Sequence, residues 1–308
     1  MHMYARLLGP ADAGEIDRLF RDGTGALFVW TPREAAGVEA SMAALKDLLT
    51  GLAPQDTFPG LDRLRADRQS FWLASRGLGT PFTPDPAFLE SLDGDPAGGR
   101  RGAAFLHGNP QAGADLETLK ESLDRALALS AAEVGIPRSW YPALTVRYRV
   151  IRYAPLRRRS AGIGMHPDGS VLSALVTDRP GLTLWRDAGT AVQPARDGTL
   201  VLPGSILHRW SEGRYDPTFH RVEVGRDAEP KFSMVAFLNF PDRSGIPRRG
   251  GTTAGRVFPN DVQACKEDDM DRGGGHWQRF AGPRPATEPR PATGPRSAAG
   301  PANALRAG

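Results

Sequence analysis

A shortage of cysteine and of long apolar runs sets the first limits on this sequence. Cys265 is the single cysteine among 308 residues, so an internal disulfide and a cysteine-based zinc site are excluded. Any metal must then be held by His, Asp or Glu. No run of about 18 uninterrupted apolar residues exists, and residues 1–10 lack the layout of a signal peptide. We therefore expect a cytoplasmic protein with no membrane partner.

The sequence also has little excess charge outside its C-terminal end. Residues 244–308 hold ten Lys and Arg against six Asp and Glu, which accounts for the whole net charge of +4. Residues 1–243 hold 29 residues of each sign and show no basic stripe interleaved with aromatic residues. Nucleic-acid binders carry such a basic surface, so we predict no nucleic-acid partner. The composition gives no prediction of the oligomeric state.

Composition separates a folded body from a C-terminal tail. Residues 282–308 are mostly Pro, Ala, Gly and Arg, with almost nothing to bury, and are predicted to be disordered. Residues 244–281 contain a few large apolar residues among many glycines, which indicates an extension packed over the body. We therefore predict a single domain over residues 1–281.

The hydrophobic pattern of the first half is typical of helices. Apolar residues spaced three and four apart predict helices over 15–23, 32–52 and 115–135. Residues 77–113 are rich in Pro and Gly and are predicted to form long loops. Residues 1–143 are thus expected to be a half made of helices and loops.

From residue 144 the pattern changes to short alternating or β-branched runs separated by Gly, Pro and Asp. These runs predict strands over 144–154, 171–178, 199–204 and 231–240. Several short strands at this spacing indicate a sandwich or a jelly roll. We predict a mainly β fold with helical support, in which the core spans residues 144–243 and the N-terminal helices pack on it.

Three residues of the β half form a candidate metal site. His166 and Asp168 lie two apart, so on an extended segment their side chains point to the same face. His220 would then come from a second strand, 220–224. Two imidazoles and one carboxylate are the ligands of the facial triad that binds non-haem Fe(II) and leaves coordination positions open for substrate and O2.

The residues around this triad resemble the isopenicillin N synthase-like family of 2-oxoglutarate and Fe(II)-dependent oxygenases. The family pattern has an HxD motif, a PGL strand, a WSNGRY phrase, an HRV motif and a final RxS. This sequence has, in the same order, HPD at 166–168, PGL at 180–182, WSEGRY at 210–215 and HRV at 220–222. The resemblance is good over residues 144–243 and looser before them, although DRLFRDGTGALFVW is similar to the family's N-terminal helix and first strand.

The resemblance implies a double-stranded β-helix, a jelly-roll barrel whose mouth holds Fe(II) on His166, Asp168 and His220. It also implies 2-oxoglutarate as co-substrate and O2 as oxidant. The reaction would hydroxylate, desaturate or cyclise a small-molecule substrate and release succinate and CO2. The identity of that substrate stays open, since one fold carries many unrelated activities.

The site implied for 2-oxoglutarate departs from the family pattern at one position. The family places an Arg two residues before a Ser to hold the distal carboxylate, and this sequence has Lys231 and Ser233. An ammonium still attracts a carboxylate but cannot form the two-pronged contact of a guanidinium. Tyr153 occupies the neighbourhood where the family places an aromatic hydroxyl near the co-substrate.

Three functions therefore stay open. The first is the 2-oxoglutarate-dependent oxygenase described above. The second is an Fe(II)-dependent oxidase or cyclase of the same fold that does not use 2-oxoglutarate, which Lys231 keeps possible. The third is a jelly roll that binds a metal or small molecule without catalysis, against which the intact triad argues.

Residues near the triad in sequence have structural interpretations. His208 in the phrase ILHRW is predicted to lie at a strand end, and Trp210 is predicted to be a core residue. Arg214 and Tyr215 are predicted to fix the turn that presents His220.

Overall fold

The computed structural model describes the part of the chain that surrounds the candidate site. The described residues are 4–7, 13–51, 62–65, 68–83, 108–153, 160–185, 191–192, 196–224, 229–240, 246–247 and 256–257. The helices are α1 (Ala13–Arg21), α2 (Pro32–Gly51), α5 (Pro110–Glu133), the 3-10 helix η2 (Arg138–Ala143) and α6 (Ser205–Trp210). No helix among these residues is long and apolar enough to cross a bilayer.

Most of the strands belong to two sheets that face each other. The major sheet has the order β1-β2-β10-β7-β12-β5-β4-β3, and the minor sheet has the order β6-β11-β8-β9. All pairs in both sheets are antiparallel except β1 with β2. The major-sheet strands are β1 (Tyr4–Leu7), β2 (Gly25–Val29), β3 (Asp62–Arg65), β4 (Arg68–Arg76), β5 (Thr145–Tyr153), β7 (Leu172–Thr177), β10 (Gly198–Pro203) and β12 (Lys231–Asn239). The minor-sheet strands are β6 (Ser160–His166), β8 (Leu182–Trp185), β9 (Ala191–Val192) and β11 (Phe219–Val224).

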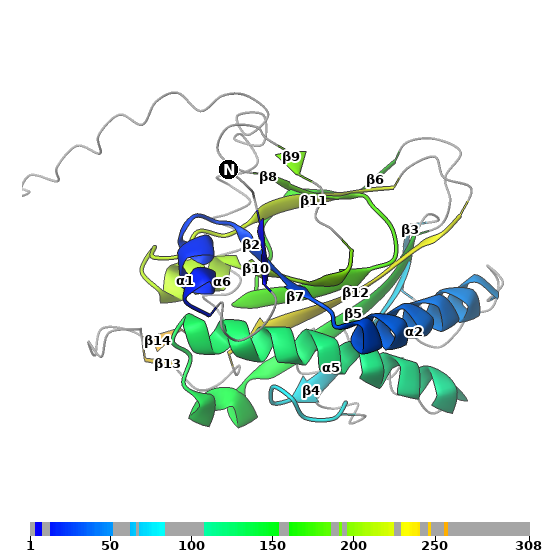
Figure 1. Cartoon of the computed structure of the whole chain (residues 1–308), viewed down its shortest axis with the longest axis horizontal. Coiled ribbons are helices and arrows are strands. Elements are labelled where there is room, and N and C mark those ends of the chain that lie inside the picture. The colour runs from blue at the N-terminus through cyan, green and yellow to red at the C-terminus, as the bar shows by residue number, and fades with distance from the viewer. Residues whose placement is uncertain are drawn as a thin grey trace, which may run out of the picture.

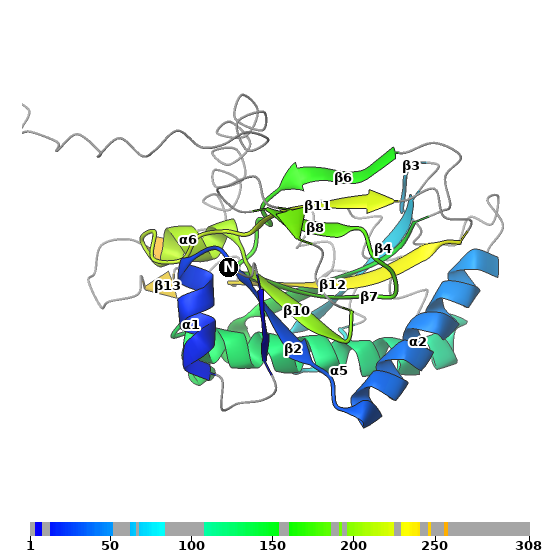
Figure 2. The same ribbon diagram turned by 45° about the horizontal axis from the view of Figure 1, so that its top comes forward.

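The two sheets enclose the interior of a barrel. Figure 1 shows β8 and β11 on one side of it and β7 and β12 on the other. Figure 2 shows α2 and α5 on the far side of the major sheet, away from the minor sheet. This arrangement confirms the predicted mainly β fold with a jelly-roll core and helices packed on it.

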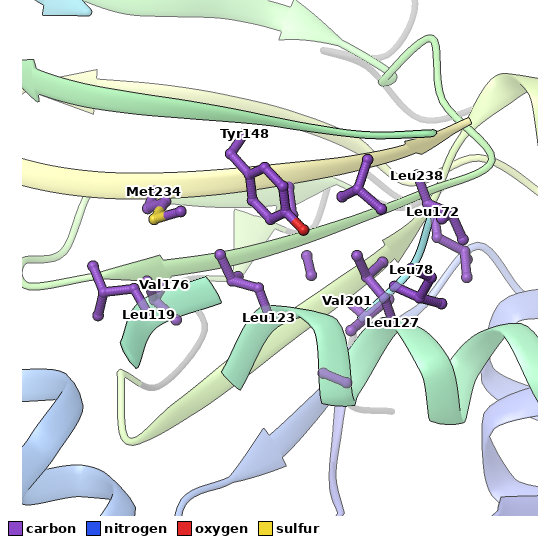
Figure 3. Close-up of a cluster of buried hydrophobic side chains, with 14 of the residues drawn as sticks. Leu78, Leu119, Leu123, Leu127, Tyr148, Leu172, Val176, Val201, Met234 and Leu238 are labelled. Atoms are coloured by element: carbon purple, nitrogen blue, oxygen red, sulfur yellow. The ribbon is translucent and has the colours of Figure 1, made fainter. Parts of the chain in front are cut away.

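The outer face of the major sheet packs against α5. Every second residue of β5 points to the helix: Val146, Tyr148 and Val150 are fully buried in the same cluster as Leu119 and Leu123. Figure 3 shows these helix leucines meeting side chains of β7, β10 and β12. Burying one such leucine contributes about 1.5–3 kcal/mol, so this contact fixes the helices on the barrel.

The inner face of the major sheet packs against the minor sheet. Leu175 of β7 and Leu200 of β10 form one buried cluster with Leu182 and Leu184 of β8. The strands β7 and β10 are therefore buried on both faces, and every one of their residues is buried. This explains why their sequences are nearly continuous apolar runs rather than alternating ones.

The first half of the chain holds more strands than its pattern predicted. The helix predicted over 32–52 is confirmed as α2, but β1, β3 and β4 were missed, and all three extend the major sheet. The prediction of a loop over 77–113 is wrong at its end, because α5 begins at Pro110. A proline suits that first helical position, since its missing N–H has no helical partner there.

Other predictions fall at the C-terminal end. Within the predicted extension, β13 (Ile246–Pro247) pairs with β14 (Arg256–Val257). The predicted disordered tail, 282–308, and Cys265 lie outside the described residues.

Candidate metal centre

Three metal-ligating side chains come together at one end of the barrel interior. His166 is the last residue of β6, and His220 is the second residue of β11. The two histidines lie directly opposite each other in the antiparallel pair, so their side chains share one face. Asp168 follows two residues after His166. The structure thus unites the three residues that the sequence analysis singled out as a candidate metal site.

The distances suit a single metal ion. Asp168 Oδ1 lies 3.6 Å from His166 Nε2 and 3.7 Å from His220 Nε2. The imidazole rings are 4.5 Å apart between centroids, and one ligand atom from each residue lies within 4.8 Å of the others. Asp168 and His220 are buried, whereas a third of the His166 side chain is exposed. Solvent therefore reaches the centre from the His166 side.

The backbone around Asp168 is anchored by the turn that begins α6. The amide and hydroxyl of Ser205 both donate to the Asp168 carbonyl, at 2.8 and 3.1 Å. Gly204 lies so close to Ser170 that any side chain there would clash with the Ser170 carbonyl. This close approach requires glycine and holds the Asp168 loop against the end of β10.

The orientation of His220 is set by the residue two positions before it. His220 Nδ1 lies 3.0 Å from the Thr218 carbonyl, which accepts its N–H and leaves Nε2 free to face Asp168. Thr218 is itself fixed, because its amide donates to the Pro203 carbonyl and its hydroxyl donates to the Gly23 carbonyl. Thr218 is thus bonded both to the end of β10 and to the turn before β2, and these bonds fix the start of the segment that carries His220.

The electrostatics of the centre favour a bound cation. Burial alone would raise the pKa of the Asp168 carboxyl, but the two histidines and a hydrogen bond from the Ser173 hydroxyl hold that pKa well below its usual value. Burial lowers the pKa of His220. A carboxylate beside two imidazoles is a donor set that suits a divalent transition metal.

Lys231, Ser233 and Tyr153 lie together at the other end of the interior. Lys231 is directly opposite Tyr153 in the pair of β12 with β5, and its Nζ is 5.8 Å from the Tyr153 ring centroid. Tyr153 packs with Ile151 against Val222 of the minor sheet, which shows that this row of residues faces inward. All three predicted co-substrate residues are buried.

Burial makes the ammonium of Lys231 easier to deprotonate. Desolvation lowers the pKa of its ammonium to about 8, although the charge of Asp178 opposes this and that of Arg196 adds to it. Lys231 is therefore mostly cationic at neutral pH. A buried cation on the inward face is a suitable partner for a carboxylate.

Two predictions near the triad have different outcomes. The prediction that His208 ends a strand is wrong, because it lies in α6 and its Nδ1 is 2.8 Å from the Tyr215 carbonyl. The apolar residues Ile206, Leu207 and Trp210 have the spacing of a helix, and this was the signal that could have found α6. Trp210 is confirmed as a buried core residue.

Arg214 and Tyr215 attach the segment before His220 to α1. Arg214 donates to the Asp17 carboxylate at 2.8 Å, and the Tyr215 hydroxyl donates to it at 2.6 Å. Glu212 and Gly213 both have positive φ, so the chain turns sharply just before these two residues. The WSEGRY phrase thus forms an anchored turn ahead of β11.

Sequence reasoning missed the residues that support the triad from neighbouring strands. Ser173 contacts Asp168 and Thr218 contacts His220, and nothing in their sequence context marks them. Arg147 and Arg149 were also missed, although the alternation of LTVRYRVIRY places both on the same face as Tyr153. That period was the signal that could have found them.

Comparison with known proteins agrees with this geometry. Residues 140–240 match the model of the 2OG-Fe(II) oxygenase superfamily. This segment includes the triad together with Lys231, Ser233 and Tyr153.

Individual relatives resemble parts of the chain. It is 29% identical over 103 residues to the 2-oxoglutarate-dependent dioxygenase tropC of Talaromyces stipitatus, over 31% of each chain. It is 26% identical over 129 residues to the validamycin A dioxygenase of Streptomyces hygroscopicus subsp. limoneus, over 39% of this chain and 34% of the relative. The chain thus spans about a third of the length of these curated relatives.

A solved structure extends the likeness to most of the fold. A full-length Neurospora crassa protein, in complex with alpha-KG and 5-formyluracil, superposes with a TM-score of 0.55 over 84% of this chain and 90% of that one. The sequences are 17% identical, so the likeness is one of fold. It agrees with the jelly-roll core described above.

Proposed function

We propose that this chain is an oxygenase of the isopenicillin N synthase-like type, which uses Fe(II), O2 and 2-oxoglutarate to oxidise a small molecule. The observation that carries the proposal is the convergence of His166, Asp168 and His220 at one end of a jelly-roll interior. The match of residues 140–240 to the oxygenase superfamily supports it, as do the names of the two curated relatives. Strands from both halves of the chain share one major sheet, and α5 packs on that sheet, which supports a single domain.

The triad is suited to hold Fe(II) through two imidazole nitrogens and one carboxylate oxygen. The Thr218 carbonyl orients His220, and the Ser173 hydroxyl orients Asp168. When bound, the iron would activate O2, with 2-oxoglutarate giving succinate and CO2, for hydroxylation, desaturation or ring closure. The protein's own part is to hold the substrate carbon beside the metal and to keep water out.

Lys231 and Ser233 are proposed to hold the distal carboxylate of 2-oxoglutarate, with Tyr153 beside them. Both side chains lie on the inward face of β12, two residues apart, and Lys231 is mostly protonated at neutral pH. The Neurospora crassa protein was solved with alpha-KG bound, which supports the same co-substrate here. A lysine contributes a point charge, so it would orient the carboxylate less tightly than an arginine.

The proposal is tested by an anaerobic titration of the metal-free protein with Fe(II) and then with 2-oxoglutarate. A visible charge-transfer band should form in the wild type and should be absent from His220→Ala. Absence of iron binding in the wild type would refute the proposal and leave a non-catalytic jelly roll.

The alternative is an Fe(II)-dependent oxidase or cyclase of the same fold that does not use 2-oxoglutarate. Lys231 in the place of the family's arginine is the observation that favours it. In that case iron would bind without a charge-transfer band on addition of 2-oxoglutarate, and O2 uptake would proceed in its absence.

A further inference from the structure

Four side chains on β4, β5 and β12 form what we call the arginine wall: Trp72, Arg147, Arg149 and Phe237. The wall faces the barrel interior. Residues of β5 with even numbers pack against α5, whereas Ile151 and Tyr153 pack against Val222 of the minor sheet. Side chains alternate along a strand, so Arg147 and Arg149 share the inward face with Ile151.

The wall combines two cations with two aromatic rings. The guanidinium carbons of Arg147 and Arg149 lie 4.6 and 5.1 Å from the centre of the Trp72 ring. The Trp72 ring is 5.8 Å from the Phe237 ring, tilted by 44°. Arg149 also donates to the Ser70 hydroxyl at 3.1 Å. Stacking on one indole thus holds two positive charges close together on the inward face.

The wall is partly accessible although it lies inside the fold. All four of its side chains are half-buried, whereas the helix-facing residues between them on β5 and β12 are fully buried. Part of each of these four residues is therefore accessible from outside the fold.

The wall begins beside the metal centre. The Ser173 hydroxyl donates to Asp168, Phe237 lies directly opposite Ser173, and Arg147 lies directly opposite Phe237. Adjacent strands are about 4.8 Å apart, so Arg147 lies about 10 Å across the sheet from Ser173. A molecule held on the wall would extend toward the metal.

We propose that the arginine wall binds the oxidised substrate, and that this substrate is a planar, aromatic carboxylic acid. This inference rests on the proposed oxygenase function and adds its substrate class. Guanidinium groups pair with a carboxylate through two parallel hydrogen bonds, and Trp72 and Phe237 offer ring faces to a flat apolar group.

2-Oxoglutarate also carries carboxylates that the arginines could bind. The places of the two cationic sites on the inward face distinguish the substrate from the co-substrate. Lys231 lies six residues before Phe237 on β12, at the opposite end of the inward face. The wall is therefore assigned to the substrate and the Lys231 end to 2-oxoglutarate.

The test measures equilibrium binding of two acids, trans-cinnamate and 2-naphthoate, and of their uncharged primary amides. Titration calorimetry is done on the full chain loaded with Mn(II) and 2-oxoglutarate, since Mn(II) avoids turnover. The acids should bind at least about tenfold more tightly than the amides, because hydrogen bonds to charged groups are the stronger ones. Arg147→Met and Arg149→Met should each weaken the acids about tenfold or more and leave the amides unchanged.

Arg152→Met is the matched control. Arg152 lies on the same strand but on its other face, where it donates to Thr50 of α2. Its loss should leave acid binding unchanged. Arg147→Lys and Arg149→Lys keep the charge without the two-pronged contact and should each give an intermediate affinity, which keeps the test valid if a methionine variant does not fold.

Three results would overturn the inference. Acids and amides could bind equally, the methionine variants could bind the acids as the wild type does, or the variants could lose affinity for 2-oxoglutarate instead of the acids. Failure of the proposed function is distinguishable, because the protein would then fail to bind Mn(II) and 2-oxoglutarate while the acids still depended on Arg147 and Arg149.

Discussion

The two ends of the barrel interior differ in how closely their residues match the pattern of the oxygenase family that the sequence resembles. At the metal end, His166, Asp168 and His220 form a complete donor set, and the backbone around Asp168 and His220 is anchored by Ser205 and Thr218. At the other end, the buried Lys231 occupies the position where the family that the sequence resembles has an arginine. On the proposed function, the metal end keeps the full donor set that the ion requires, whereas the other end offers the carboxylate an ammonium in place of a guanidinium.

Loss of a metal ligand should have the largest effect. His220→Ala is expected to weaken Fe(II) binding by more than about a hundredfold, because loss of a group that only orients a ligand already costs about 10- to 100-fold. Anaerobic Fe(II) titration measures it. His208→Ala is the matched control, since this histidine contacts the Tyr215 carbonyl rather than the triad. Equal Fe(II) affinity in the wild type and in His220→Ala would show that His220 does not bind the metal.

Substitution of Lys231 should affect the co-substrate alone. Lys231→Ala is expected to weaken 2-oxoglutarate binding by about 10- to 100-fold, the value of a charged hydrogen bond, and to leave Fe(II) affinity unchanged. Lys231→Arg should retain binding. The dissociation constant for 2-oxoglutarate, measured on the Mn(II)-loaded protein, checks both variants. Unchanged binding in Lys231→Ala would assign the carboxylate to another residue.

The same lysine predicts a pH dependence. Only the ammonium form attracts the carboxylate, and the pKa of Lys231 is about 8. The affinity for 2-oxoglutarate should therefore be constant below this pH and fall by about tenfold per pH unit above it, as the proton is lost. Lys231→Arg should remove this fall, because arginine stays charged. Titrations between pH 6.5 and 9.5 would reveal a flat wild-type profile if Lys231 plays no part.

A smaller effect is expected from the hydroxyl that supports Asp168. Ser173→Ala removes a hydrogen bond to that carboxylate and should weaken Fe(II) binding by about tenfold, at the lower end of the range for such supporting groups. The affinity for 2-oxoglutarate on the metal-loaded protein should be unchanged. An equal loss of both affinities would show that the two ends do not act separately.

The smallest effect should be on stability. Tyr215→Phe removes a hydrogen bond to Asp17 and is expected to lower the free energy of unfolding by about 1–2 kcal/mol, measured by urea denaturation. Fe(II) affinity should stay within about twofold of the wild type, because Thr218 is held by its own bonds to Pro203 and Gly23. A large loss of Fe(II) affinity would instead show that the turn formed by residues 210–215 helps to position the metal-binding residues.

The β core and the pair His166 and Asp168 were predictable because they depend on patterns close along the chain, whereas the assignment of the distant His220 drew on the family resemblance of its HRV phrase. His166 and Asp168 are two residues apart, and the sequences of β5 and β12 alternate. Cross-strand register has no such local signature. The contact of Ser173 with Asp168 and the stacking of Arg147 on Trp72 therefore emerged only from the fold. β4 was missed because Pro- and Gly-rich segments surround it, although residues 71–74 form a short apolar run that is consistent with a buried strand.

The most direct test of the central claim compares O2 uptake with succinate formation. The Fe(II)-loaded protein is supplied with ascorbate and air, with and without 2-oxoglutarate, over many hours. The account predicts that succinate forms in step with O2 uptake, that both require 2-oxoglutarate, and that Asp168→Ala forms none. O2 uptake that proceeds equally without 2-oxoglutarate, or succinate no higher than in Asp168→Ala, would contradict it.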